Sequence, residues 1–191
     1  MVCGRSEFFR RAMNGDWAER SDRFVKFPED EVEVFSAYTN LVYTNKIVTP
    51  EALFGEIPTM EKLRLEHDFL SKLYVLSEKL QDYRAKVHVL EAFLAVAQEK
   101  TAVVAWIVPG PVAVQTLYNG TPATSVARRL FVDLWTRTNV SSLSSHCRAM
   151  PHDFVCDLVL ALHKLLYETG YDGRESKGTI SLEEIIAKGA T

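Results

Sequence analysis

The chain has 191 residues, enough for one domain of good core size or for one domain with a helical extension. Hydrophobic residues make up 47% of it and charged residues 25%, which is the ordinary globular pattern. The net charge of −3 shows no basic excess and argues against nucleic acid as a partner, because phosphate binding depends on clustered lysine and arginine.

The sequence shows no segment suited to a membrane or to secretion. The longest apolar run, residues 102–114, is short of the ~20 residues that span a bilayer, and it contains Pro109-Gly110-Pro111. Charged residues between Arg5 and Arg11 interrupt any signal-peptide pattern. Three cysteines, an odd number, argue for a reducing compartment and against a disulfide framework. We therefore predict a cytoplasmic or nuclear protein with no membrane partner.

The first elements lie between Ser6 and Asn45. Ser6 is a suitable N-cap for a short helix, and residues 23–27 alternate polar and apolar side chains, which predicts a short strand. Pro28-Glu29-Asp30 favours a turn and then a helix N-terminus, so a second helix should follow and end near Asn45. The apolar stripes of the two helices are Phe8, Phe9, Ala12 and Met13, and then Val34, Phe35, Tyr38, Leu41 and Val42.

A helical hairpin is predicted for residues 61–97, with a break at Gln81-Asp82. Apolar residues recur at helical spacing in both arms, and His67 and His88 are expected at surface or boundary positions. The predicted stripes are Phe69, Leu73, Leu76 and Leu80 in the first arm, and Tyr83, Val87, Leu90, Leu94 and Ala97 in the second.

The remaining residues also favour helices. Pro111 can open a helix at its first position, and residues 119–122 should end it. Ser125 should cap a helix with the stripe Val126, Ala127, Leu130, Phe131, Leu134 and Trp135. Residues 141–145 suggest a serine-rich linker, and 181–189 a last short helix with a capping box. Between these two segments a further amphipathic helix is predicted, with the apolar stripe Phe154, Leu158, Leu162, Leu165 and Leu166. The predicted fold is a mainly α helical bundle with one or two short strands.

Three N-terminal motifs, taken in order, resemble the BTB/POZ domain. They are Arg5-Ser6-Glu7-Phe8-Phe9, the Pro28-Glu29-Asp30 turn, and residues 41–47, Leu-Val-Tyr-Thr-Asn-Lys-Ile. The family usually has glycine where Asn45 stands, and asparagine supports the same left-handed conformation. Only residues 1–4 precede the first motif, so the resemblance implies an α+β BTB fold whose N-terminal sheet is largely missing. The chain is then either a short variant or a fragment of a longer BTB protein, and the unpaired strand favours self-association.

A second block resembles the C-terminal extension of fungal BTB proteins. It comprises Leu117-Tyr118-Asn119-Gly120-Thr121-Pro122 and Arg128-Arg129-Leu130-Phe131-Val132-Asp133-Leu134-Trp135. The resemblance therefore implies a partial BTB/POZ-like domain at 1–100 and a helical extension at 101–191.

The resemblance implies a protein–protein interaction module without enzymatic activity or cofactor. In BTB adaptors of cullin-type ubiquitin ligases, a hydrophobic-x-glutamate element in the loop after this helix helps to grip the cullin. Trp17-Ala18-Glu19 matches that element, and Tyr43 of the Tyr-Thr motif lies near the same surface in the family. Trp17, Glu19 and Tyr43 are therefore the predicted protein-binding residues. The other interpretation is that Trp17 packs on the core beside Phe9 and Met13, with Glu19 in solvent.

The alternative function is a small helical metal-binding or enzymatic domain centred on His146, Cys147, His152 and Cys156. These residues are zinc-type ligands within one short segment, but they lack the paired Cys-x-x-Cys spacing of common zinc sites. A Cys–His nucleophile pair would need an orienting third group, which the sequence does not supply. No glycine-rich phosphate loop, nucleophile elbow or metalloprotease helix is present, so we predict no enzyme.

Overall fold

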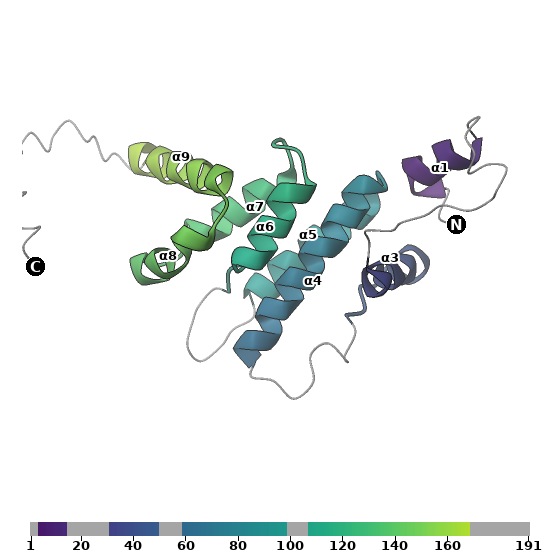
Figure 1. The fold of residues 1–191 in the computed structure, drawn as a ribbon, viewed down its shortest axis with the longest axis horizontal. Helices are drawn as coiled ribbons and strands as arrows, with labels where there is room; N and C mark the ends of the chain where they lie inside the picture. Colours follow the sequence, from purple (N-terminus) through teal and green to yellow (C-terminus); the bar gives the residue numbers. More distant parts are fainter. Residues whose placement is uncertain (1–3, 15–30, 50–58, 99–106, 169–191) are drawn as a thin grey trace, which may run out of the picture.

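The computed structural model describes residues 4–14, 31–49, 59–98 and 107–168. Within these ranges the chain is mainly helical, as the sequence predicts, and contains no strand (Figure 1). The predicted strand at 23–27 and the predicted last helix at 181–189 lie outside the described residues. The helices are α1 (Glu7–Asn14), α3 (Val32–Thr44), α4 (Thr59–Lys79), α5 (Tyr83–Gln98), α6 (Pro111–Gly120), α7 (Val126–Trp135), α8 (Val140–His146), the 3-10 helix η3 (Cys147–Ala149) and α9 (His152–Glu168).

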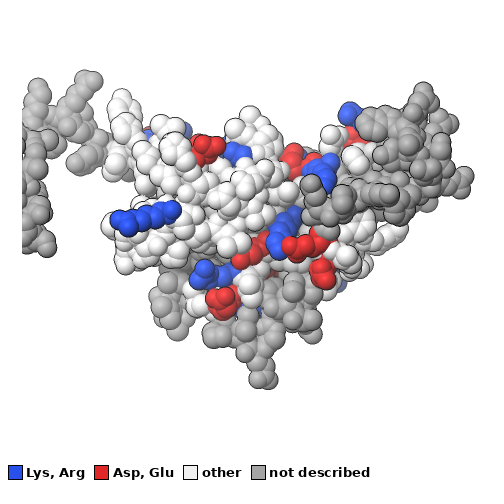
Figure 2. Space-filling view, in the orientation of Figure 1, with Lys and Arg blue, Asp and Glu red and all other residues white. Residues whose placement is uncertain are grey.

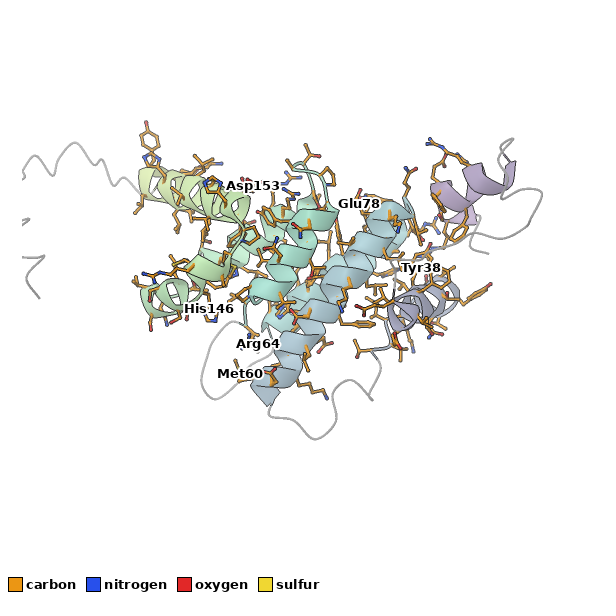
Figure 3. All side chains as sticks on the ribbon, viewed as in Figure 1. Tyr38, Met60, Arg64, Glu78, His146 and Asp153 are labelled. Carbon is orange, nitrogen blue, oxygen red and sulfur yellow. The ribbon has the colours of Figure 1, made fainter. Side chains whose placement is uncertain are left out.

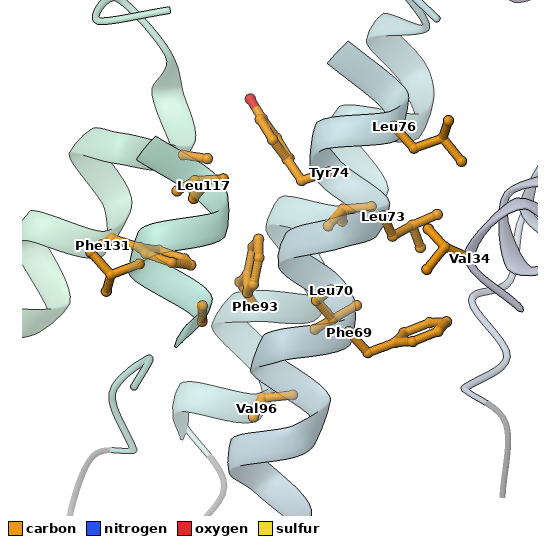
Figure 4. Packing of buried hydrophobic residues seen from close by; sticks show 14 of the residues in the cluster. Val34, Phe69, Leu70, Leu73, Tyr74, Leu76, Phe93, Val96, Leu117 and Phe131 are labelled. Carbon is orange, nitrogen blue, oxygen red and sulfur yellow. The ribbon is translucent and has the colours of Figure 1, made fainter. Parts of the chain in front are cut away.

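Helix α4 lies at the centre of the fold, in contact with α3, α5 and α6. Its apolar residues cover more than one face, because it is packed from several sides. Phe69, Leu73 and Leu76 point toward Val34 of α3, whereas Tyr74 points toward α6 and α7 (Figure 4). The predicted stripe of the first hairpin arm is therefore confirmed. It is one of two buried faces of α4.

The buried face of α5 differs from the predicted one. Tyr83 and Leu94 are 74% and 38% exposed. The helix buries Ala85, Val89, Phe93 and Val96 together with Ala97. The predicted stripe was therefore confirmed at Ala97 and wrong at Tyr83 and Leu94, because α5 is apolar on several sides. The side that packs against α4 is the one that is buried.

The turn between α4 and α5 is a Schellman motif, as the predicted break suggested. Gln81 adopts the left-handed conformation with φ 53°. Its N–H donates to the Glu78 carbonyl at 3.0 Å, and the Asp82 N–H donates to the Ser77 carbonyl at 3.0 Å. The Asp82 carboxylate then accepts the Ala85 N–H at 3.0 Å and caps α5. One residue thus ends one arm of the hairpin and begins the other.

The buried Asp82 carboxylate also holds the two N-terminal helices. The Asp82 side chain is 0% exposed, and its Oδ2 lies 3.4 Å from Nε of Arg5 and accepts the Tyr38 hydroxyl at 3.1 Å. Ser6 donates to the Leu80 carbonyl at 2.6 Å and accepts the Phe9 N–H at 3.2 Å, which caps α1. Arg5 and Ser6 therefore fix α1 and α3 to the hairpin.

The second half of the fold is closed by a buried arginine that sequence patterns did not single out. Arg128 of α7 donates to the Tyr118 carbonyl at 2.6 Å and to the Thr121 carbonyl, which satisfies the end of α6. Its guanidinium lies 4.4 Å from the centre of the Tyr118 ring. The Tyr118 hydroxyl in turn donates to Asp157 of α9 at 2.8 Å. These contacts join α6, α7 and α9.

Two details of α7 and α8 correct the predictions. Val126 is 51% exposed and Leu130 is half-buried, whereas Arg128 and Val132 are buried, so the buried face of α7 is rotated from the predicted stripe and centres on Phe131. Residues 141–145 are not a linker, because they form most of α8. Asn139 accepts the Ser142 N–H at 2.8 Å and starts that helix. Within it, the hydroxyls of Ser144 and Ser145 donate to the Ser141 carbonyl. Residues 141–145 are therefore helical behind the Asn139 N-cap, although serine is a weak helix former.

Removing the Asp82 carboxylate should destabilise the whole N-terminal half. We expect Asp82→Ala to lower the free energy of unfolding by ~3–5 kcal/mol, because it leaves Arg5 buried without its partner. Asp82→Asn should lose less, since an amide oxygen can still cap α5. Urea unfolding followed by circular dichroism measures both. Glu91→Ala, which removes an exposed side chain paired with His88, is the control and should cost under ~0.5 kcal/mol. An equally small loss for Asp82→Ala would contradict the central role of this carboxylate.

A side chain at Gly120 should be costly because α6 and α4 approach closely there. A Cβ at residue 120 would lie 2.4 and 2.6 Å from the two methyl carbons of Val75, a β-branched side chain with little freedom to move. We expect Gly120→Ala to cost ~1–3 kcal/mol in urea unfolding, although alanine favours helix more than glycine does. Val75→Ala in the same chain should recover most of the loss. A neutral Gly120→Ala would show that the two helices are not in contact at this point.

Candidate functional site

Helix α3 presents one exposed face along its whole length. Val32, Ser36, Asn40 and Tyr43 follow one another at helical spacing, and all four are exposed. Val32 is 79% exposed and Tyr43 67%. The opposite face, with Val34, Tyr38 and Leu41, is buried against α4 and α5. Of the three predicted protein-binding residues, Tyr43 is the one that the structure describes, and it lies at the end of this exposed face.

The helix end that carries Tyr43 is held in place by Arg5. Its Nη1 donates to the carbonyls of Leu41 and Val42 at 3.3 and 3.1 Å and to Oδ1 of Asn45 at 3.2 Å. A cation at a helix C-terminus also complements the helix dipole. Asn45 adopts φ 56° and donates its N–H to the Leu41 carbonyl at 2.9 Å, which confirms the left-handed conformation predicted for it. The Tyr43 backbone is therefore fixed while its ring is in solvent.

Trp17 and Glu19 lie outside the described residues. The competing interpretation, in which Trp17 packs beside Phe9 and Met13, also stays a prediction. Phe9 itself is buried, and its ring meets Phe8 edge to face at 5.6 Å.

The four residues of the alternative function do not converge on one point. The His146 ring bonds the Ser142 carbonyl through Nδ1 at 2.9 Å and packs against Trp135, whereas Cys147 bonds the Ser144 carbonyl. Within the described ranges, no group of three or more His, Cys, Asp or Glu side chains is placed to hold a metal ion. The arrangement gives the metal-site alternative no support.

His152 and Cys156 do meet, one turn apart on the exposed face of α9. The Cys156 sulfur lies 3.7 Å from Nδ1 and 3.8 Å from Nε2 of the ring, so it is not directed at either nitrogen. Asp153 approaches the same Nδ1 at 3.8 Å. In a nucleophile triad the thiol and the carboxylate bind different ring nitrogens, and neither contact here has that geometry. This pair therefore lacks the arrangement of an activated nucleophile.

His67 is the buried titratable residue that sequence patterns placed wrongly. It is 0% exposed, not at the surface, and it stacks on Phe93 of α5 with ring centres 6.1 Å apart. Neither ring nitrogen makes a hydrogen bond of normal geometry. Burial lowers the pKa of His67 to about 4, and the backbone of Leu63 opposes that shift only in part. At neutral pH the ring is uncharged and acts as a core residue.

A pocket of about 530 Å³ opens between the N-terminal part of α4, residues 107–110 and the start of α8. The Trp135 ring lies in its wall, with the indole N–H donating to the Pro109 carbonyl at 3.1 Å. Arg64 and Met60 of α4 and His146 of α8 are among its lining residues (Figure 3). Its size falls within the range of small-ligand sites. Sequence patterns missed it because the lining that the structure describes comes from three separate stretches of the chain, 60–64, 107–110 and 135–146.

Searches of protein-family models, curated proteins and solved structures found no match to the chain. No helix among the described residues is long and apolar enough to cross a membrane.

The buried His67 should make stability depend on pH. Its pKa is near 6.5 in the unfolded chain and about 4 in the folded one, so the unfolded state binds a proton first as the pH falls. The stability that the folded protein has with a neutral His67 is complete above pH 6.5 and is lost as the pH falls from 6.5 to about 4. Between about pH 8 and pH 5 we expect a loss of about 2 kcal/mol, measured by urea unfolding. His67→Leu should remove this part of the slope, whereas His152→Leu, at an exposed histidine, should not. Equal slopes in all three proteins would contradict the assignment.

Proposed function

We propose that the chain is a protein–protein interaction module of the BTB/POZ type, and that it contacts a cullin-type partner through the exposed face of α3 and the preceding loop. The observation that carries the proposal is Tyr43, a large aromatic residue that is 67% exposed at a rigidly held helix end. Aromatic residues are frequent anchors of protein interfaces. A fixed backbone lowers the entropy that such an anchor loses on binding.

Three local features support the family assignment. The Arg5-Ser6 pair bonds the ends of α3 and α4, so the motif that carries the resemblance has a structural role. Asn45 takes the left-handed conformation for which the family uses glycine. The paired helices α4 and α5 agree with the helical hairpin that closes a BTB domain. Each feature is local, and together they follow the order that the resemblance requires.

The proposed mechanism is surface complementarity without a cofactor. Tyr43 would fill a pocket on the partner, with Asn40 and Ser36 supplying hydrogen bonds along the same face. Trp17 and Glu19 would add the hydrophobic-x-glutamate contact from the loop. An adaptor of this type works where cullins are, so the proposal places the protein in the cytoplasm or nucleus.

Self-association is the second part of the proposal, and α9 supports it. The helix exposes a series of large apolar side chains, and Figure 2 shows that uncharged residues cover most of the surface over α8 and α9 on that side. Large apolar side chains that are exposed together on one helix are typical of interaction surfaces. The exposed residues of α9 are Val159, Leu160, Leu165, Leu166 and Tyr167.

A pull-down with purified cullin tests the proposal. We expect Tyr43→Ala, Trp17→Ala and Glu19→Ala each to weaken capture by about tenfold or more, the scale of an interface hot spot. Tyr43 is exposed, so its truncation should leave the helical circular dichroism unchanged. Tyr83→Ala, at a similarly exposed tyrosine on α5, is the matched control and should bind like the wild type.

Three results would count against parts of the proposal. Unchanged capture in all three variants would remove the α3 surface. A Trp17→Ala protein that unfolds would favour the core interpretation of Trp17. A wild-type chain that captures no cullin would leave only a general interaction module.

A further inference from the structure

We infer that the pocket beside Trp135 is a binding site for a carboxylate attached to an apolar group. This site is separate from the α3 surface, and it does not depend on a cullin partner. The ligand can be a small organic acid or an acidic side chain next to a large apolar one in a peptide, and both offer the same chemistry.

The apolar residues that line the pocket determine which apolar group of a ligand it can hold. Ile107, Val108 and Pro109 line one side, and Met60 and Trp135 add further apolar surface. Trp135 cannot rotate away freely, because its indole N–H is bonded to the Pro109 carbonyl and its ring packs on Phe154 at 6.1 Å. A rigid aromatic wall of this kind suits a flat or branched apolar group.

The cations in the lining set the charged part. Among the lining residues that the structure describes, Arg64 and Arg137 lie with one acid, Glu61, which gives this part of the lining one formal positive charge apart from His146. A singly charged carboxylate matches this balance better than a doubly charged phosphate does. Guanidinium groups also pair with carboxylates through two parallel hydrogen bonds.

Arg64 is the cation best placed to act. No hydrogen bond or ion pair engages its guanidinium among the residues that the structure describes, although its charge acts on Asp68 one turn away. Its Nε and Nη2 both lie 3.7 Å from the position that a Cβ on Gly110 would occupy. A Cβ at residue 110 would therefore fit beside the guanidinium, whereas a larger side chain would compete with it for the pocket mouth.

His146 adds a polar group whose orientation is fixed. Its Nδ1 is bonded to the Ser142 carbonyl at 2.9 Å, an acceptor, so Nδ1 carries the proton. In the neutral ring Nε2 is then an acceptor, so it suits an N–H or O–H donor beside the carboxylate and not the carboxylate itself. The ring packs edge to face on Trp135 with centres 6.0 Å apart, which joins the polar and apolar parts of the site.

Matched probes test the site by nuclear magnetic resonance of the assigned Trp135 indole N–H. The small-molecule pair is 4-phenylbutyrate and its neutral amide, and the peptide pair is acetyl-Phe-Glu-amide and acetyl-Phe-Gln-amide. For 4-phenylbutyrate, with about twelve non-hydrogen atoms, we expect a dissociation constant on the order of 1 mM. The acids should shift the Trp135 signal at concentrations about tenfold lower than the neutral partners do.

Three variants assign the binding to named groups. Arg64→Gln should weaken binding of the acids about tenfold and leave the amides unchanged, whereas Arg84→Gln, at an exposed arginine of α5 outside the lining, should change neither. Gly110→Leu should fill the mouth and abolish binding of all probes. Gly110→Ala should be tolerated, because the backbone at φ −73° and ψ 174° suits any residue and its Cβ would make ordinary contacts.

The outcomes distinguish a peptide ligand from a small organic acid, and they show whether the inference fails. Binding of the peptide alone would assign the site to a protein segment, and binding of 4-phenylbutyrate at least as tight would assign it to a small acid. Equal shifts from acid and amide, or no shift of Trp135 by either acid up to about 10 mM, would overturn the inference. Because cullin capture is measured separately, either result leaves the α3 proposal untouched.

Discussion

The N-terminal half of the structure depends on one buried carboxylate. Asp82 has no exposed surface, yet it serves three neighbours: it caps α5 through the Ala85 N–H, accepts from Tyr38 of α3 and pairs with Arg5. Burial, together with the charge and hydrogen bond of Asp82, raises the pKa of the Tyr38 hydroxyl above its ordinary value, so Tyr38 remains a donor. A buried charge is costly unless it is paired and hydrogen-bonded, and these contacts meet that condition.

In the C-terminal half a buried cation, Arg128, joins helix ends as the Asp82 carboxylate does in the N-terminal half. Arg128 satisfies the open carbonyls at the end of α6, and the Tyr118–Asp157 bond extends the contact to α9. Burial and the Asp157 hydrogen bond raise the pKa of Tyr118 in the same direction as for Tyr38. One hydrophobic cluster extends from Val34 of α3 to Leu158 of α9, with α4 at its centre. Polar contacts thus close the helix ends while the shared core holds the halves together.

The sequence predicted the helices that have strong local signals. Pro111, the Gln81-Asp82 break and the left-handed Asn45 each act through their own backbone conformation, so they could be recognised one at a time. Features that depend on distant contacts were missed. Leu94 and Ala85 lie in the same apolar helix, and only packing against α4 decides which is buried. His67 has ordinary helical spacing, and nothing local distinguishes a buried histidine from an exposed one.

The two candidate sites also differ in whether a local sequence signal or distant contacts identify them. Tyr43 could be named from a short motif, whereas the Trp135 pocket needed the fold, because Arg64, Pro109 and His146 are far apart in the chain. The two surfaces lie on opposite sides of α4, with α3 on one side and α6 to α8 on the other (Figure 1). A partner on α3 would therefore leave the pocket accessible. The proposed adaptor would need that separation to hold one protein while it recognises another, and α4 would keep the two surfaces at a fixed relative position.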